Sequence, residues 1–554
     1  MDASKYGIGY YPAPGVNNDW VTKDHIEKPP VWCSVDMRDG NQSLVIPMSF
    51  EEKLEYYKLL LEVGFKEIEV GFPAASETEY EFLRALIDRN LIPEDVTVQV
   101  LTQCREHIIR KTFEACKGAP SAIIHFYNSV SVVQREQVFR KSKEEIKQIA
   151  VDGARLVKKL AAEYEGNFRF EYSPESFTGT EPEYALEVCN AVLDVLEPSE
   201  TNRVIINLPV TVEMSLPHVY ASQVEYMSKN LKYREYVTLS LHPHNDRGTG
   251  VADTELALLA GADRVEGTLF GNGERTGNVD IITLAMNMYA HGVDPGLDFS
   301  NMPHMVEVYE KCTRMHVYER SPYSGALVFA AFSGSHQDAI AKGMKYREEK
   351  QLHRWNVPYI PIDPHDISRT YDADIIRVNS QSGKGGIGYI LEQVYGYVLP
   401  AGMREHLSYL CKSVSDHQHK ELKAPEVLDI FKRHYFLNSP SLMIGNMNFT
   451  RRGNLVEADI LFVRDGEKTT IHATGNGSLD AVSNALKSFT GDSYVLQVYT
   501  EHSMQEKGSG SVAVAYIGIK NQDGVMSWGA GSDTDIIHAS ADALLSAYHN
   551  MTHP

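Results

Sequence analysis

The chain of 554 residues carries a formal net charge of −21, with 43% hydrophobic and 23% charged residues. This length allows roughly two to four domains with sizeable cores, and the composition is typical of a soluble globular protein. An acidic surface repels phosphate groups, so the charge argues against a nucleic-acid partner and against binding to an anionic membrane.

The cysteine pattern and the first residues bear on the compartment. The six cysteines are dispersed and form no CxxC pair, which favours reduced thiols and excludes a thiolate zinc cluster. Residues 1–20 lack the apolar core of a signal peptide, and no apolar run approaches the length of a membrane span. We therefore expect a cytoplasmic protein.

Short apolar segments alternate with amphipathic ones over residues 31–305. The pattern predicts strands at 31–37, 65–72, 96–102, 121–129, 167–176, 203–210, 237–241 and 264–270, with helices between them, the longest at 133–164. Eight strand–helix units in about 260 residues predict a (β/α)8 TIM barrel. An open doubly wound sheet is the alternative, but it needs fewer units and usually a glycine-rich first turn, which RDGNQ at 38–42 is not.

The rest of the chain follows a different plan. Residues 1–30 form an N-terminal extension to the barrel of residues 31–305, residues 306–436 a mainly helical linker region, and residues 437–554 a C-terminal α+β domain. This last region contains an internal repeat, because 457–489 and 512–548 share the order strand, turn, strand, G-x-G-S and Ala/Leu-rich helix. We predict a duplicated βββα unit whose two helices pack together.

The glycines of this repeat precede a predicted helix in each copy. They are Gly475 and Gly477 in the first copy and Gly529 and Gly531 in the second. Backbone amides at a helix N-terminus can bind a carboxylate, which makes these glycines candidate residues of a regulatory site. The alternative is that they permit tight turns, and the sequence alone does not decide between the two.

The triplet HPH follows the predicted strand at 237–241. Successive side chains of a strand point to opposite faces, so His242 and His244 leave the strand on the same side. His417 and His419 repeat the spacing in a segment predicted to be helical, where a two-residue step places side chains on nearly opposite faces. A His-x-His pair alone is more often structural, so we expect metal binding only where the strand end brings other ligands nearby.

Polar residues follow the carboxyl end of every predicted strand, the end that holds the active site in such barrels. They include Arg38 and Asp39, Glu69, Thr102, His125 and Tyr127, Ser173 and Glu175, Thr211, His242 and His244, and Glu274 with Asn278. An aspartate and two histidines form a mixed oxygen and nitrogen set, which suits a divalent cation that keeps positions open for substrate. Such a cation chelates a 2-oxo acid and polarises its ketone, and Arg38 is placed to stabilise the developing oxyanion.

The motifs RDGNQ, HPHND and GNGERTGN, together with the duplicated terminal unit, resemble the 2-isopropylmalate synthase family. This family belongs to a superfamily of metal-dependent, pyruvate carboxyltransferase-like TIM barrels. The resemblance covers nearly the whole chain and implies an acyltransferase of leucine biosynthesis. It condenses acetyl-CoA with 3-methyl-2-oxobutanoate and water to give (2S)-2-isopropylmalate and CoA. The implied cofactor is a divalent cation, with Mg²⁺ preferred over Mn²⁺ or Zn²⁺, and K⁺ is a further candidate activator.

The resemblance also implies a role for each matching residue. The metal ligands are Asp39, His242, His244 and Asn278, and the residues that contact the oxo acid are Arg38, His125, Ser173 and Thr211. Catalytic roles fall to Arg38, Glu175, Glu274, His336 and Tyr371. The last two come from the motifs SGSHQD and RTY, and the resemblance implies that they act in the partner protomer. The sequence does not decide whether His336 or Tyr371 is the general base.

The resemblance further implies a homodimer in which leucine binds the C-terminal domain and inhibits the enzyme. Three rival readings remain. A carbon–carbon lyase of the same superfamily carries a cysteine in the loop after strand eight, where this chain has GNGERTGN. A homocitrate or citramalate synthase differs only in its oxo acid, and one methylene is worth only about 1–3 kcal/mol. A leucine-binding protein on an inactive barrel would not need the complete ligand set.

Overall fold

The computed structural model describes the chain except for residues 332, 372–383, 419–421, 437–441, 505–510 and 554. The chain divides into two compact units, Met1–Val328 with Pro364–Arg369, and Phe329–Asp363 with Thr370–Pro554. Within the described residues, no helix is both long and apolar enough to cross a membrane.

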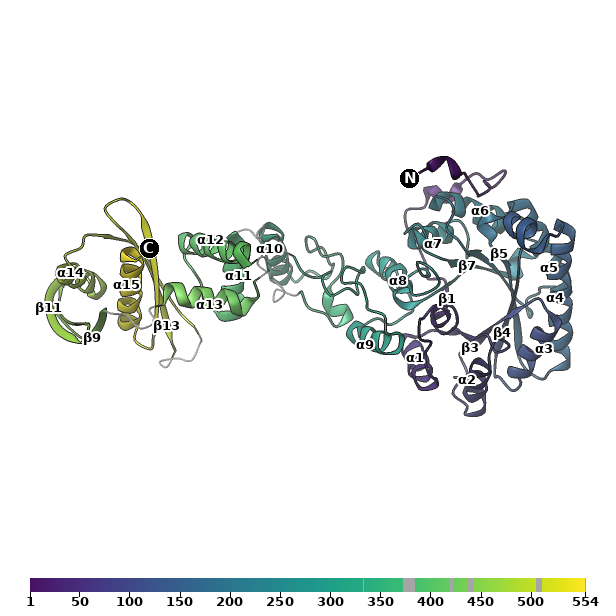
Figure 1. Ribbon diagram of the computed structural model, residues 1–554, viewed down its shortest axis with the longest axis horizontal. Coiled ribbons are helices and arrows are strands. Elements are labelled where there is room, and N and C mark those ends of the chain that lie inside the picture. The colour runs from purple at the N-terminus through teal and green to yellow at the C-terminus, as the bar shows by residue number, and fades with distance from the viewer. Residues whose placement is uncertain (332, 372–383, 419–421, 437–441, 505–510, 554) are drawn as a thin grey trace. The chain divides into compact units, whose positions relative to one another are not determined.

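The first unit is a closed barrel of eight parallel strands in the order β1 to β8, in which β1 also pairs with β8 (Figure 1). The strands are β1 Val31–Ser34, β2 Glu67–Gly71, β3 Thr97–Gln103, β4 Ala122–Ser129, β5 Phe168–Glu175, β6 Val204–Val210, β7 Val237–Pro243 and β8 Arg264–Gly267. The predicted TIM barrel is therefore confirmed, and the open sheet is excluded.

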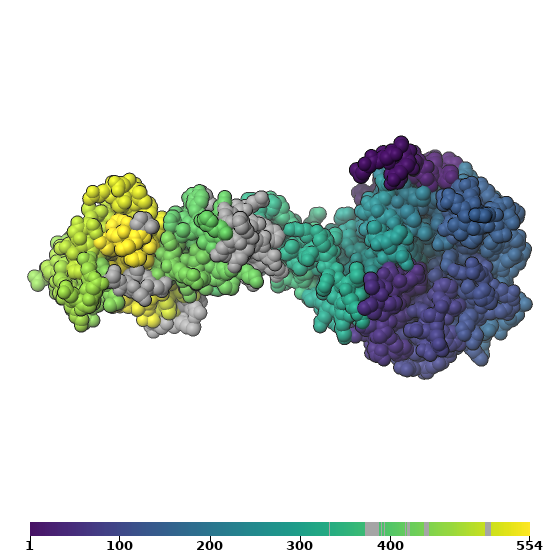
Figure 2. Space-filling model, viewed as in Figure 1, coloured from purple at the N-terminus to yellow at the C-terminus, as the bar shows by residue number. Residues whose placement is uncertain are grey.

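Helices surround the barrel, as the alternation of the sequence predicts (Figure 1). They are α1 Phe50–Val63, α2 Glu77–Asp88, α3 Glu106–Ala115, α4 Lys143–Glu163, α5 Pro182–Leu196, α6 Pro217–Asn230, α7 Gly250–Leu259, α8 Ile281–Ala290 and, after the barrel, α9 Met302–Thr313. Residues 1–30 lie on the outer surface of this unit (Figure 2), where Lys23 Nζ donates to Leu259 O and Asn18 N to Glu225.

The amphipathic run at 133–164 forms two helical segments rather than one. A π-helical segment, Gln134–Phe139, ends at Arg140, which has a left-handed φ of 53°, and α4 begins only after Ser142. The side chain of Ser142 caps the helix by accepting from Glu145 N, while Glu145 accepts from Ser142 N, which makes a reciprocal capping box. The amphipathic pattern spans both segments, so it hides the break.

The second unit begins with helices and ends in two sheets. The helices α10 Gly334–Lys350, α11 Lys384–Tyr395, α12 Ala401–Gln418 and α13 Ala424–Tyr435 confirm the mainly helical linker. The first sheet holds β9 Leu442–Arg452, β10 Leu455–Arg464 and β11 Glu467–Gly475, followed by α14 Ser478–Thr490. The second holds β12 Val495–Ser503, β13 Ala513–Lys520 and β14 Met526–Asp533, followed by α15 Ile536–Thr552. Both helices and both sheets contribute to one apolar core, which confirms the duplicated βββα unit.

The glycines of the repeat occupy different positions in the two copies. Gly475 ends β11 and Gly477 is the N-cap residue of α14, but Gly529 and Gly531 lie inside β14 rather than at a helix N-terminus. A Cβ on Gly529 would overlap the backbone of α15 at Ala543 and Ala547. These two glycines therefore let a helix lie directly on its sheet, which is a packing role.

Candidate metal centre and active site

The metal site predicted from the sequence is built by two strand ends and one turn. His242 lies in β7, and His244 follows it in a bridge to Asn278. Asp39 lies in a π-helical turn, Asp36–Gly40, directly after β1. The buried carboxylate of Asp36 accepts from Leu269 N at 3.1 Å, so this turn is tied to the end of β8.

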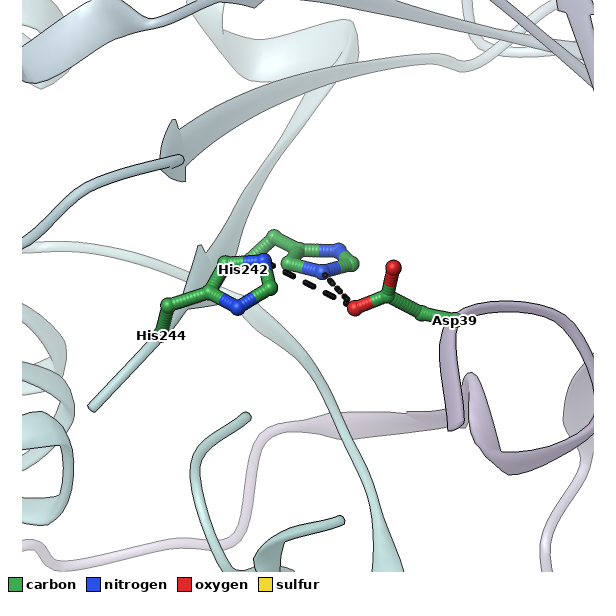
Figure 3. Close-up of side chains that lie close together, drawn as sticks. All are labelled: Asp39, His242 and His244. Carbon is green, nitrogen blue, oxygen red and sulfur yellow. Dashed lines mark ion pairs between the residues drawn. The ribbon is translucent and has the colours of Figure 1, made fainter. Parts of the chain in front are cut away.

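The three side chains converge on one point (Figure 3). Asp39 Oδ2 lies 3.5 Å from His242 Nε2 and 3.6 Å from His244 Nε2, and all three residues are buried. Asn278 Nδ2 donates to the same oxygen at 2.7 Å. Gly277 allows the loop that carries Asn278 to fold back toward Asp39. It has a φ of +95° and lies so close to Gly271 O that a side chain would not fit.

The donor set fits a divalent cation. Ligands at right angles and about 2.1 Å from an ion lie about 3 Å apart, close to the separations found here. Two polar atoms beside the centre, His244 Nδ1 and Asn278 Oδ1, are buried without a hydrogen-bond partner among the described residues. Buried polar atoms are rarely left unpaired, so the amide oxygen of Asn278 is available as a ligand or as an acceptor for bound water.

The charges around the centre favour an ionised aspartate. Burial opposes ionisation of Asp39, but the guanidinium of Arg38 and the two imidazoles outweigh it and hold the pKa of Asp39 well below its usual range. Burial also opposes protonation of His242, yet the carboxylates of Asp39 and Glu266 raise its pKa to about 9. Burial and the neighbouring His242 lower the pKa of His244 to about 4. At physiological pH His242 is therefore protonated, and a cation that binds there must displace this proton, whereas His244 is already neutral.

A cavity of about 230 Å³ opens beside this centre at the carboxyl ends of the strands. Its walls include every barrel residue to which the resemblance gives a substrate or catalytic role: Arg38, His125, Ser173, Glu175, Thr211 and Glu274, together with His242 and His244. The side chains that follow the carboxyl ends of the strands therefore lie around one cavity, as the sequence predicts.

The polar residues of the cavity are held by one another. Arg38 donates from Nε to Glu69 at 2.5 Å and from Nη1 to Asp39 at 2.8 Å. His125 contacts Glu69 through Nδ1 at 2.9 Å and Ser173 Oγ through Nε2 at 2.7 Å.

The acidic residues and the threonine of the cavity also have partners. Thr211 Oγ1 accepts from Ser176 N at 2.9 Å, which leaves its hydroxyl hydrogen for a ligand. Glu175 is bonded by Ser129 Oγ, and Glu274 accepts from Gln42 at 3.1 Å. These contacts fix both carboxyl groups at the mouth of the cavity.

His336 and Tyr371 belong to the other unit. His336 is exposed in the first turn of α10, where its ring stacks on Tyr359 with centroids 4.0 Å apart. Tyr371 is half-buried next to the segment 372–383, which lies outside the described residues. In the comparison pair, His417 is exposed near the end of α12, and His419 lies outside the described residues.

Several residues of the cavity were missed by the sequence reasoning. Asn207, Pro209 and Arg275 line it, and Arg275 also donates to Asp246 at 2.7 Å. Asn207 carried a signal, because it is a polar residue inside the apolar strand RVIINLPV. Glu266 carried the same signal in RVEGTLF, although nothing in the sequence tells which residue it contacts.

Comparison with known proteins covers almost the entire chain. Residues 29–309 match the HMGL-like family, residues 326–392 the family described as alpha-isopropylmalate synthase, post-catalytic domain-like, and residues 416–552 the LeuA allosteric (dimerisation) domain. The chain is 60% identical to the 2-isopropylmalate synthase of Desulfitobacterium hafniense (strain Y51), over 99% of this chain and 98% of that one. It is also 60% identical to that of Helicobacter hepaticus over the full length of both, and 53% identical to that of Clostridium acetobutylicum over 96% of each.

Proposed function

The chain belongs to the 2-isopropylmalate synthase family, and we propose that it condenses the acetyl group of acetyl-CoA with 3-methyl-2-oxobutanoate to give (2S)-2-isopropylmalate and CoA. The observation that carries the proposal is the convergence of Asp39, His242 and His244 beside the cavity, in a chain with full-length relatives of that name. This reaction is the committed step toward leucine in that family.

Asp39, His242, His244 and Asn278 would hold the divalent cation, with Mg²⁺ preferred and Mn²⁺ or Zn²⁺ as alternatives. When bound, the cation supplies a Lewis acid for the ketone and carboxylate oxygens of the oxo acid. Arg38 complements it, because its bonds to Glu69 and Asp39 use only part of its five N–H donors. The remaining hydrogens are placed to stabilise negative charge on the ketone oxygen as the new bond forms.

Three residues would bind the carboxylate of the oxo acid. Thr211 has a hydroxyl hydrogen to donate, since its oxygen already accepts from Ser176 N. His125 and Ser173 share one hydrogen bond and face the same cavity, so the carboxylate would accept a hydrogen bond there in exchange for the bond between them. Positioning both reactants in this way removes much of the entropic cost of the bimolecular step.

The reaction needs a base, a proton donor and water. A base removes one proton from the acetyl methyl group, the resulting carbon attacks the ketone carbon, and the alkoxide takes up a proton. Water then cleaves the thioester and releases CoA as a thiol. We assign these proton transfers to Glu175, Glu274, His336 and Tyr371, with the last two acting from the partner protomer of a homodimer.

The terminal domain would regulate this reaction. Its match to the LeuA allosteric (dimerisation) domain supports a homodimer in which leucine binds and inhibits. Of the repeat glycines, Gly477 remains a candidate for a regulatory site, because it is the N-cap residue of α14 with open space around it, whereas a Cβ on Gly475 would overlap the backbone of α14 at Ala481. Monovalent K⁺ is a proposed activator.

The proposal is tested by measuring thiol release from acetyl-CoA with a panel of 2-oxo acids, with and without a chelator. We expect 3-methyl-2-oxobutanoate to give the highest kcat/KM and the chelator to abolish turnover. A higher value with 2-oxoglutarate or pyruvate would identify a homocitrate or citramalate synthase instead. No thiol release with any oxo acid, with leucine binding intact, would identify a binding protein on an inactive barrel.

A further inference from the structure

One arginine lies in the middle of the barrel below the metal centre. Arg264, the first residue of β8, is fully buried. Its Nε donates to Glu67 Oε2 at 2.6 Å, its Nη1 to Glu266 Oε1 at 2.8 Å, and its Nη2 to Gln99 Oε1 at 2.6 Å. Charged side chains are almost never fully buried unless they are paired, so this cluster is specifically built.

Arg264 determines which way the amide of Gln99 points. Arginine can only donate, so the amide atom 2.6 Å from its Nη2 is the oxygen of Gln99. The NH2 group of Gln99 therefore faces Glu266 Oε1 at 2.7 Å and donates to it. The orientation of this amide, which is often ambiguous, is fixed here by the hydrogen-bond network.

The acceptor sites of Glu266 are filled by donors. Oε1 accepts from Arg264 and Gln99, and Oε2 accepts from Asn207 Nδ2 at 3.2 Å. The fourth contact joins Oε2 to His242 Nδ1 at 2.6 Å. The guanidinium of Arg264 bonds this carboxyl group directly and favours its ionised form, which can only accept, so the hydrogen in this bond lies on Nδ1.

We propose that Arg264 and Glu266 are positioning residues that lock His242 in its Nδ1–H tautomer. With Nδ1 held as the donor, Nε2 is the nitrogen that gives up its proton to bind a cation at the centre, where Asp39 Oδ2 lies 3.5 Å away. A histidine ligand whose second nitrogen donates to a carboxylate is held in orientation and made a stronger ligand. His244 differs, because its Nδ1 is buried and has no partner in the part of the chain that the structure describes. This inference rests on the proposed role of His242 as a metal ligand.

Replacing Glu266 by Gln keeps the shape of the side chain and reverses one contact. Arg264 and Gln99 both donate toward the Oε1 position, so the new amide oxygen must occupy it. The new NH2 group then faces His242 Nδ1, which must accept, and the hydrogen moves to Nε2. We expect the Mn²⁺ dissociation constant of the full-length E266Q protein to rise about 10- to 100-fold.

Glu67→Gln is the matched control. Glu67 is also a buried partner of Arg264, and its other oxygen accepts from Arg169 at 2.6 Å, but it has no bond to His242. We expect E67Q to leave the Mn²⁺ dissociation constant close to that of wild type. If Mn²⁺ binding depended only on the buried negative charge and not on the position of His242, E266Q and E67Q would weaken it equally.

The experiment is calorimetric titration of Mn²⁺ into wild type, E266Q, E67Q and His242→Ala, with thermal unfolding of each metal-free protein as a check on folding. Long-range ¹H–¹⁵N spectra of histidine-labelled, metal-free protein, recorded as the pH is raised through the pKa of His242 until its ring is neutral, read the tautomer, with the H242A spectrum as the assignment. Nδ1–H in wild type and Nε2–H in E266Q support the inference. A folded E266Q with wild-type Mn²⁺ affinity, or E67Q weakened by the same factor, would overturn it. Unchanged Mn²⁺ binding in H242A would instead refute the proposed metal site.

Discussion

The loop that follows His242 and His244 is anchored by two acidic residues, and their pairing predicts a pH-dependent stability. Glu213 is buried and accepts from Arg247 N and Thr249 Oγ1 in this loop. Asp253, in the first turn of α7, is 2% exposed. Burial and the carboxylate of Glu213 raise the pKa of Asp253 to about 8. The folded protein therefore holds a proton on Asp253 that the unfolded chain releases near pH 4.

The sign of the effect follows from this raised pKa. The stabilisation is fully present below about pH 4 and is lost as the pH rises toward 8, because the unfolded chain then binds fewer protons. The loss is at most about 1.4 kcal/mol per pH unit, which gives an upper limit of about 4 kcal/mol between pH 5 and 8. Asp253→Asn imitates the protonated acid and removes this dependence.

The measurement is the melting temperature of wild type and D253N at pH 5, 6.5 and 8. We expect the advantage of D253N over wild type to grow steadily with pH. Asp95→Asn is the control, because Asp95 is exposed and its hydrogen bond from Lys66 lowers its pKa, so it should give no such gain. An advantage of D253N that is equal at pH 5 and 8 would refute the argument.

Three further substitutions test other parts of the structure. His244→Ala should lower kcat in the thiol-release assay by roughly two orders of magnitude or more, whereas replacement of the exposed His417 by Ala should not. Equal losses would contradict the assignment. Gly529→Ala should lower the melting temperature, because the added methyl group overpacks the contact with α15 at a cost of about 1–3 kcal/mol. Gly477→Ala should be tolerated, because there is open space around Gly477. A larger fall in melting temperature for G477A than for G529A would show that the packing role is wrong. Asp36→Ala leaves a buried tyrosine hydroxyl and a backbone amide without an acceptor, so both stability and Mn²⁺ affinity should fall. An unchanged Mn²⁺ affinity would show that the turn holds Asp39 in place without the Asp36 carboxylate.

The barrel and the location of its site were predictable because both follow from periodicity. Alternation of apolar strands and amphipathic helices specifies parallel pairing, and parallel strands bring their carboxyl ends to one face. This reasoning placed Asp39 beside His242 and His244, although about 200 positions of sequence separate them. The same periodicity failed at Arg140, because apolar residues alone do not show which face is buried: Val133 and Val138 are exposed, whereas Arg135 is buried. The S-x-x-E capping box at Ser142 was the signal of the new helix start.

The interior of the barrel could not be predicted for a different reason. Glu67 and Arg264 are charged residues in short apolar strands, and in isolation each is an exception to the pattern. Their pairing depends on which inward-facing residues meet across the closed barrel, and that depends on register. Gly529 is a similar case, because the sequence shows a glycine before a helix but not that the helix folds back over it.

The claim on which the account depends is that Asp39, His242 and His244 hold a single divalent cation. The most direct test is a crystal structure of the full-length protein grown with Mn²⁺, with data collected to locate manganese by its anomalous scattering. We expect one anomalous peak bonded to Asp39 Oδ2 and to Nε2 of both histidines. A protein with no peak at this position, or with manganese bound only elsewhere, would contradict the account.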